Sequence, residues 1–535
     1  MASYELLLGP VLGYEWDEEN SQSLYTVIVR ARGAAPMWNV DGQDIPMKAI
    51  TASLPDKSRV WRGEIPLTPF AAGVAARSVA YLVKRGNTRL KNVCGEDHWS
   101  FHLPGKLTPG LQPRIAFCSC NGFTDPNAMS GINPLALWER MKVMHDQEPL
   151  SLLLMGGDQL YCDDLARKEG SFARVWTWLK PGEKPQGPPN AHDFLKAYFD
   201  HYLMTWGRIV QVKGQQTFEY PHTAMVQMMA CVPSVMMWDD HDIFDGWGSY
   251  QASEKKIPYY KEAFEAARQA FEVYQIRGKS SNRSLLDRKA PRPRHYSQGL
   301  KFGTYDILVM DNRTHRTPSQ VMDGNQWSQI LKWLERTQPT GPKTIKSTLL
   351  VVSPVPVVYR RFHNWVSELP GEHGGEDDLR DHWSHHTHEG ERDRLVHHLF
   401  QVLKYEGNEV EENGKGKYDR VTLLSGDVHV GALGFLERTD ASAEIAQVIS
   451  SAIMHPAPGA LAWEGLKAIS SDADHGIQGQ PVVAKMTRAV GAKDRYLRCR
   501  NFAWLKEGDD QKLWVNWECE NLDEKTPERV EFGLR

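Results

Sequence analysis

The feature that most constrains the fold is a repeated pattern in which a short apolar run is followed at once by reactive polar side chains. The pattern occurs five times, in runs of five or six residues: RIAFC (114–118), SLLLM (151–155), SVMMW (234–238), YDILVM (305–310) and DRVTLL (419–424). Short apolar runs of this kind predict buried strands. Because ligands bind outside the carboxyl ends of the strands in open α/β sheets, we expect the five polar ends to form one site.

Segments with helical spacing lie between these runs. They cover residues 133–144, 259–274 and 325–335. Strands that alternate with helices predict a layered α/β domain.

The first hundred residues have a different pattern, in which apolar and polar positions alternate and Gly and Pro stand between the runs. It predicts strands at residues 23–32, 59–67, 77–85 and 97–103. We therefore expect a small β-sandwich of the fibronectin or immunoglobulin type over residues 1–107. The Pro- and Gly-rich stretch 104–113 predicts the boundary, so that residues 108–535 form the second domain.

Charge and composition argue against several classes of protein. The 535 residues include 63 Lys and Arg against 67 Asp and Glu, a net charge of −4, which gives no reason to expect a nucleic-acid or membrane partner. No run approaches the roughly 18 apolar residues of a membrane helix, and the amino terminus has neither a basic export signal nor a twin arginine. With 7 cysteines and no CxxC spacing, the sequence predicts a cytoplasmic protein of open oligomeric state.

The second run ends in two glycines, which let the backbone turn tightly, and then presents Asp158. A pair of cations about 3.5 to 4 Å apart needs a bridging carboxylate, and Asp158 is the candidate. Tyr161 follows three residues later, a spacing that lets one turn present both oxygens to one ion. A phenolate favours a hard ion such as ferric iron. The alternative is that Tyr161 is a loop tyrosine packed beside a helix.

The first run leads to Cys120, which we predict as a thiolate ligand of the same ion because metal coordination deprotonates a thiol. The alternative is a cysteine that is merely buried. Cys118 lies two residues earlier on the same strand and points deeper into the core, so we assign it a structural role.

The third run is followed by four acids and a histidine within residues 239–245. Like charges this close together raise one another's pKa, so their density indicates cation binding. Asp240 and Asp245 are the predicted ligands, and His241 is the predicted general acid or phosphate partner. Asp239 and Asp242 either take part or only cap and solvate the turn.

The last two runs supply an arginine and another acid–histidine pair. Asp427 and His429 stand two residues apart, on one face if extended, where a carboxylate and an imidazole can share a metal pair. The alternative is an exposed Asp and His in a turn. Arg313 has the planar fork that holds phosphate oxygens bidentately, although it could instead pair with Asp311 as a structural bridge.

A histidine-rich region, residues 372–394, also suggests metal binding. We interpret it as a mobile, charged loop over the site whose histidines are mostly solvated. His385, His386 and His388 are therefore not among the predicted ligands.

Taken in order, five motifs resemble the alkaline phosphatase D, or PhoD-like, family of metallophosphoesterases. They are FxSC (117–120), GDxxY (157–161), WDDHD (238–242), DxR (311–313) and LSGDVH (424–429). The likeness extends from about residue 113 to 460, and a preceding β-sandwich also suits the family. The missing twin-arginine signal, which many members carry, favours an intracellular branch.

The resemblance implies a four-layer α/β/β/α phosphoesterase domain with iron and calcium at the site. The family's iron ligands map onto Cys120, Asp158, Tyr161 and His429. Its calcium ligands correspond to Asp158, a carboxylate of the WDDH motif, Asp427 and a residue shortly after that motif. There this sequence has Asp245 where the family often has Asn. This extra negative charge leaves the second metal open, with Mn, Zn or Mg as alternatives.

These expectations combine into a metal-dependent phosphoric ester hydrolase, acting on monoesters, diesters or both. In it, a hydroxide activated by two metals attacks phosphorus in line, Arg313 and the cations stabilise the developing charge, and His241 assists the leaving oxygen. The expected partner is a small phosphate-ester substrate. The alternatives are a non-catalytic protein that keeps the fold and binds a phospho-ligand, and a nuclease or phospholipase-type diesterase with the same chemistry.

Overall fold

The computed structural model describes most of the chain: residues 6–110, 112–123, 132–162, 191–213, 216–221, 223–249, 260–289, 292–363, 382–408, 416–489, 491–520 and 529–535. The described residues form a mixed α/β structure with several sheets and seven helices. The helices are α1 (Ala136–Gln147), α4 (Ala191–Gly207), α5 (Thr223–Cys231), α6 (Tyr260–Tyr274), α7 (Gly324–Arg336), α9 (Glu389–Val402) and α10 (Ala460–Ile469). None of these seven has the length and apolar character that crossing a bilayer requires.

The three predicted helical segments are confirmed as α1, α6 and α7. Helix α7 illustrates why the sequence folds this way. Its buried face repeats at helical spacing through Trp327, Ile330 and Leu334. Asp323 caps its amino end, because the side chain accepts a hydrogen bond of 2.7 Å from the backbone N–H of Gln326.

A ten-stranded sheet contains the first three apolar runs. Its order is β28 (Arg529–Leu534), β27 (Leu513–Cys519), β26 (Asn501–Glu507), β10 (Arg114–Cys118), β11 (Leu150–Gly156), β14 (Ser234–Met237), β1 (Leu6–Asp17), β2 (Gln22–Arg32), β6 (Ser58–Leu67) and β5 (Lys48–Ala49). Strands β10, β11 and β14 are parallel neighbours. Their carboxyl ends therefore meet at one edge, as predicted.

A nine-stranded sheet contains the other two runs. Its order is β15 (Gln298–Phe302), β16 (Tyr305–Val309), β17 (Thr348–Val352), β19 (Arg420–Ser425), β21 (Glu444–Ser450), β20 (Gly431–Arg438), β24 (Val482–Thr487) and β23 (His475–Gly476), with β25 (Tyr496–Leu497) beside β20. Strands β16, β17, β19 and β21 run parallel. Two short antiparallel pairs complete the α/β part: β12 (Arg208–Lys213) with β13 (Gln216–Pro221), and β18 (Arg361–Phe362) with β22 (Ser470–Ser471).

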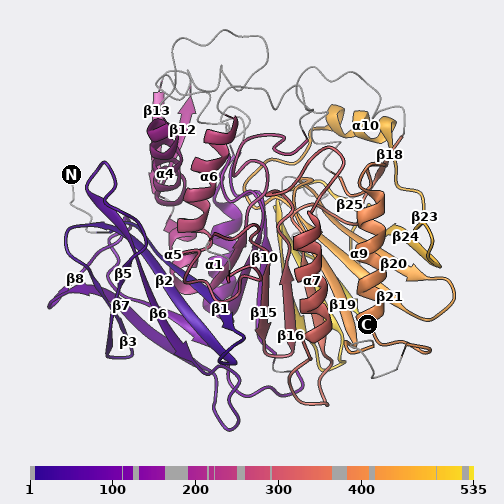
Figure 1. Cartoon of the computed structure of the whole chain (residues 1–535), viewed down its shortest axis with the longest axis horizontal. Coiled ribbons are helices and arrows are strands. Elements are labelled where there is room, and N and C mark those ends of the chain that lie inside the picture. Colours follow the sequence, from indigo (N-terminus) through magenta and orange to yellow (C-terminus); the bar gives the residue numbers. More distant parts are fainter. Residues whose placement is uncertain are drawn as a thin grey trace.

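The two faces of the nine-stranded sheet are buried in different cores, which explains the continuous apolar runs. In β16, Ile307 and Val309 belong to the core shared with the ten-stranded sheet, whereas Leu308 packs with α7 and α9. The sheets approach closely near the site, since a Cβ on Gly156 would lie 2.5 Å from Phe117 and 3.4 Å from Val352. Figure 1 shows strands lying between α4 and α6 on one side and α7 and α9 on the other.

The predicted amino-terminal strands are confirmed as β2, β6, β7 (Arg77–Arg85) and β9 (Trp99–Leu103). Strands β7 and β9 belong to a five-stranded sheet that also contains β3 (Met37–Val40), β4 (Gln43–Pro46) and β8 (Thr88–Arg89). It packs against β2, where the rings of Tyr25 and Phe101 stack 5.1 Å apart. The amino-terminal strands nevertheless continue into the ten-stranded sheet, because β1 pairs with β14 in parallel, with Gly13 opposite Ser234. The boundary at residue 107 stays a prediction, and no break in this sheet marks it.

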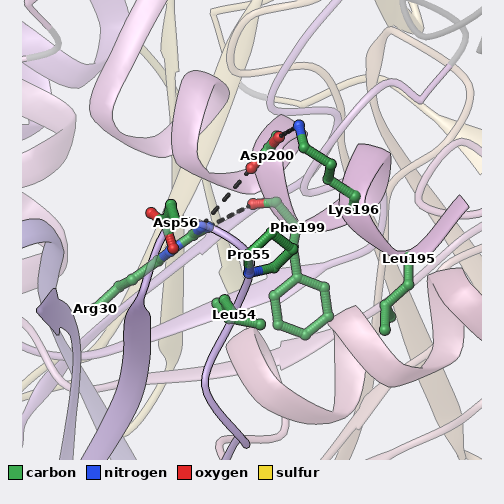
Figure 2. A pocket seen from close by; sticks show the side chains of 8 residues that line it. All are labelled: Arg30, Leu54, Pro55, Asp56, Leu195, Lys196, Phe199 and Asp200. Atoms are coloured by element: carbon green, nitrogen blue, oxygen red, sulfur yellow. Dashed lines mark hydrogen bonds and ion pairs between the residues drawn. The ribbon is translucent and has the colours of Figure 1, made fainter. Parts of the chain in front are cut away.

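A buried arginine joins the amino-terminal strands to the helices beyond (Figure 2). Arg30 of β2 forms ion pairs of 3.2 Å with Asp56 and 3.7 Å with Asp200 of α4. Its guanidinium also donates to the Phe199 carbonyl at 3.0 Å and the Tyr274 hydroxyl at 3.2 Å. We call this group the Arg30 joint; Lys196 lies 2.6 Å from Asp200, so that two cations face its two acids.

Candidate metal centre

The ends of β10, β11, β14 and β19 bring the predicted ligands together at one edge of the two sheets. The Cys120 thiol donates a hydrogen bond of 3.4 Å to Oδ2 of Asp158 and lies 4.0 Å from the backbone oxygen of Asp427. On the other side, the Tyr161 hydroxyl lies 3.1 Å from Nε2 of His429. The convergence expected from the strand ends is therefore present for these five residues.

The backbone at these positions is strained. Cys120, Asp158, Asp427 and His429 have φ angles of 53°, 52°, 68° and 52°, in the left-handed region that side-chain-bearing residues rarely adopt. Such strain persists where the surrounding structure enforces it, and it concentrates at functional sites. Gly157 completes the turn with a φ of 122°, and a Cβ there would lie 3.0 Å from Cβ of Asp239. Glycine is thus required for β11 to present Asp158 against the WDDHD turn.

Three acids gather around Asp158. Carboxylate oxygens of Asp158, Asp239, Asp240 and Asp427 all lie within 4.8 Å of one another. A second group of donor atoms within the same distance consists of Asp158, Asp240 and His241. Burial raises the pKa of Asp158 well above its usual range, and the neighbouring acids raise it further, against the opposing effect of His241. Its Oδ1 atom is buried and accepts no hydrogen bond from the described residues. A cation would compensate both the charge and this atom.

Cys120, Tyr161 and His429 also fit a metal by the chemistry of their donors. Burial raises the pKa values of the Cys120 thiol and the Tyr161 phenol well above their usual ranges, so both need a cation to ionise. Burial lowers the pKa of His429 well below its usual value, with further lowering from His455 and His241. The imidazole is therefore neutral, which is its ligating form. Adjacent ligands with bonds of about 2.1 Å at right angles lie about 3 Å apart, a spacing comparable with that between Tyr161 and His429.

Asp239 and Asp242, the two acids of the WDDHD turn whose roles the sequence left open, have different roles in the structure. Asp242 is a cap: it accepts backbone hydrogen bonds of 3.0 Å from Gln159 and 2.8 Å from Asp239, and a third of 2.8 Å from the Gln275 amide. Burial raises its pKa to about 7. Asp239, in contrast, belongs to the acid cluster around Asp158.

Arg313 lies beside the acid cluster. Its side chain is fully buried, and the guanidinium donates to the carboxylate of Asp239, to Oδ1 of Asp240 at 3.2 Å and to the Trp247 carbonyl at 3.1 Å. Its role in stabilising a phosphate stays a prediction. Asp311 accepts hydrogen bonds from the Trp238 indole at 3.0 Å and from the Arg313 backbone at 3.1 Å. Arg313 thus positions two acids of the cluster.

Asp245 lies at the edge of the site. Its side chain is 51% exposed, and Oδ1 lies 4.0 Å from Nε2 of His241. It is absent from the groups of donor atoms found among the described residues, so its role as a calcium ligand stays a prediction. His241 itself is nearly buried and stacks on the Tyr161 ring at a centroid distance of 4.3 Å.

Two residues that sequence reasoning missed follow β21. Ser451 accepts a hydrogen bond of 3.1 Å from the backbone N–H of His429, and its hydroxyl lies 3.1 Å from Sγ of Cys120. The His455 ring stacks on His429. The available signal was the apolar end of EIAQVIS (444–450) with Ser451 and His455 after it, a sixth occurrence of the pattern.

The remaining cysteine and histidine predictions have different outcomes. Cys118 is buried in the core. Residues 372–381 lie outside the described residues, but the expectation of solvated histidines is wrong for two of the three in the next turn. His385 and His388 are buried, and His386 alone of the three is exposed. His388 lies with Nε2 3.2 Å from the Thr317 carbonyl, and burial lowers its pKa to about 3.

The comparison with known proteins agrees with the resemblance that the five motifs suggested. The model of the PhoD related phosphatase family matches residues 131–369. A curated relative from Saccharomyces cerevisiae (strain ATCC 204508 / S288c), the uncharacterized protein YGR266W, is 24% identical over 390 residues, which cover 63% of this chain. The match spans about half of that relative, 52% of its length.

Among solved structures, the purple acid phosphatase PPD1 from yellow lupin (Lupinus luteus) seeds aligns with a TM-score of 0.48 at 12% identity. The alignment covers 98% of this chain and 74% of that one. The family match confirms the resemblance predicted from the five motifs over residues 131–369.

Proposed function

We propose that this chain hydrolyses phosphoric esters at a two-metal centre built around Asp158, on a four-layer α/β/β/α fold. The observation that carries the proposal is the buried cluster of Asp158, Asp239, Asp240 and Asp427. Arg313 is the buried cation that contacts two of these acids. A cluster with this excess of negative charge is costly in a folded protein unless cations bind to it.

Cys120, Asp158, Tyr161 and His429 would hold one ion, for which iron suits the phenolate and thiolate donors. Asp158, Asp240 and Asp427 would hold the second, with Asp239 as an addition from the geometry and Asp245 as a further candidate. Calcium suits these oxygen donors, and Mn, Zn or Mg are alternatives. When bound, such a pair of ions activates water and neutralises the charge on the transferring phosphoryl group.

The chain's own residues prepare this chemistry. Arg313 fixes the orientation of Asp239 and Asp240 by donating to both. Asp242 fixes the turn that carries them. His241 is the proposed proton donor to the leaving oxygen, and its Nε2 lies 4.0 Å from Oδ1 of the Asp245 carboxylate.

The test is hydrolysis of a chromogenic monoester and a chromogenic diester, p-nitrophenyl phosphate and bis(p-nitrophenyl) phosphate, by protein loaded with each candidate metal. Asp158→Asn keeps the size of the side chain and removes its charge, and we expect kcat/KM to fall by at least about 10³-fold. Asp474→Asn, at an exposed position, is the matched control and should leave the rate unchanged. Equal rates for wild type and Asp158→Asn would contradict the assignment of the site.

A further inference from the structure

The ring of His455 stacks on the rings of two predicted metal ligands, His429 and Tyr161. Its centroid lies 3.7 Å from that of His429 at an interplanar angle of 22°, and 5.2 Å from that of Tyr161 at 20°. The Tyr161 ring also stacks on His241, at a centroid distance of 4.3 Å. The two predicted ligands that lie 3.1 Å apart therefore share one neighbouring ring.

The position of the His455 ring is itself fixed from two directions. Its backbone N–H donates to the Cys120 carbonyl at 3.2 Å, which ties the residue to the end of β10. Its Nδ1 lies 2.9 Å from the Pro456 carbonyl. Because a carbonyl only accepts, Nδ1 carries the hydrogen, and this bond sets the rotation of the ring.

We propose that His455 is a positioning residue that holds Tyr161 and His429 in mutual contact by the flat face of its ring. The ring planes of His455 and His429 meet at 22° with their centroids 3.7 Å apart, so His455 contacts this predicted ligand through the face of its ring. The effect of His455 on a bound metal rests on the proposed function. Its effect on the contact between Tyr161 and His429 is independent of that function.

A pair of apolar substitutions separates ring shape from ring nitrogens. His455→Phe keeps a flat ring and loses both nitrogens, whereas His455→Leu has an apolar side chain without a flat face. His455→Ala serves as the second non-planar variant if the leucine protein does not fold. His397→Phe, at an exposed position on α9, controls for the general effect of replacing a histidine.

The first readout is the crystal structure of each metal-free variant. We expect the separation of the Tyr161 hydroxyl from His429 Nε2 to stay near the 3.1 Å of the wild type in His455→Phe and to open beyond hydrogen-bonding distance in His455→Leu. The second is the tyrosinate charge-transfer band of the iron-loaded proteins, unchanged in His455→Phe and weakened or shifted in His455→Leu. The third is kcat, which we expect to fall by about 10- to 100-fold in His455→Leu alone, with KM little changed.

Two outcomes would overturn the proposal. An unchanged contact, band and kcat in the non-planar variants would mean that the ring is not needed. An equal loss in His455→Phe and His455→Leu would mean that a ring nitrogen acts directly, as a ligand or proton carrier. A wild-type protein that binds no metal and hydrolyses neither ester would refute the proposed function. The metal-free crystal structures would still decide the role of His455.

Discussion

Two buried groups of charged residues in this molecule differ in how their charges are compensated. In the Arg30 joint, one guanidinium meets two acids that keep contact with water, since the side chains of Asp56 and Asp200 are 27% and 37% exposed. Lys196 adds a second cation, 2.6 Å from Asp200 (Figure 2). In the centre around Asp158, Arg313 contacts two of four clustered acids.

The difference shows which charged groups a fold can accommodate without a bound ion. Charges that are paired and partly hydrated need no ligand, so the Arg30 joint is complete as a structural link. Acids that outnumber their cations in a buried site raise one another's pKa and destabilise the metal-free fold. We therefore expect a bound cation to complete the Asp158 centre and to offset its cost to stability.

The largest expected effect separates activity from stability at the centre. Asp158→Asn removes one charge from the cluster, so the free energy of unfolding of the metal-free protein should stay equal or rise, while kcat/KM falls by at least about 10³-fold. Denaturant unfolding in the presence of a chelator, beside the ester assay, measures both. A variant that is inactive because it is markedly less stable would break the comparison, since Asp158 would then have a structural role.

Replacing Arg313 and Arg30 in turn by Met tests the difference between the Asp158 centre and the Arg30 joint. Arg313→Met leaves Asp239 and Asp240 buried without their guanidinium, and we expect the metal-free protein to lose about 3–5 kcal/mol of unfolding free energy. Saturating divalent cation should restore part of this loss, because the ion takes over the compensation. If added metal leaves the stability of the variant unchanged, the cluster is not a cation site.

The pH dependence of the metal-free protein provides a third test. Burial raises the pKa of Asp242 from 3.8 to about 7, so the folded state holds this proton more tightly than the unfolded state. The stability that this group contributes is complete below about pH 4 and is lost as the pH rises through about 7. We expect the free energy of unfolding to fall by up to a few kcal/mol over that window. Asp242→Asn should flatten the profile, and an equally steep profile in this variant would contradict the attribution.

The smallest effect is expected at the Arg30 joint. Arg30→Met removes the hydrogen bonds to Phe199 and Tyr274, but the acids it leaves behind are partly hydrated, so we expect a loss of about 1–3 kcal/mol. Cations should not restore it, and kcat per folded molecule should stay at the wild-type value. Recovery of stability on adding metal would mean that the joint, too, binds ions.

The sequence predicted much of this arrangement because short-range patterns carry it. All five apolar runs are strands, and Cys120, Asp158, Tyr161, Asp427 and His429 converge as their order at strand ends suggested. What the sequence did not show depends on contacts across the fold. Arg313 contacts Asp239 and Asp240 of the WDDHD turn, which lie 74 and 73 residues away in the sequence.

Other features were hidden by local sequence. Strand β1 contains Gly9 and Pro10, which usually interrupt strands, and its pairing with β14 spans more than two hundred residues. His455 stands five residues after the end of β21; the apolar run before it was a signal in the sequence, but its place beside Tyr161 and His429 depends on the path of the loop.

The most direct test of a two-metal centre around Asp158 is anomalous scattering from crystals of the purified protein, combined with elemental analysis of the same preparation. Our account predicts two ions per chain, one in contact with Tyr161 and His429, the other among Asp240 and Asp427, and Asp158 between them. It also predicts that Asp158→Asn loses at least one of the two. A fully occupied site elsewhere in the chain, or protein that binds no ion at the Asp158 cluster after loading, would contradict it.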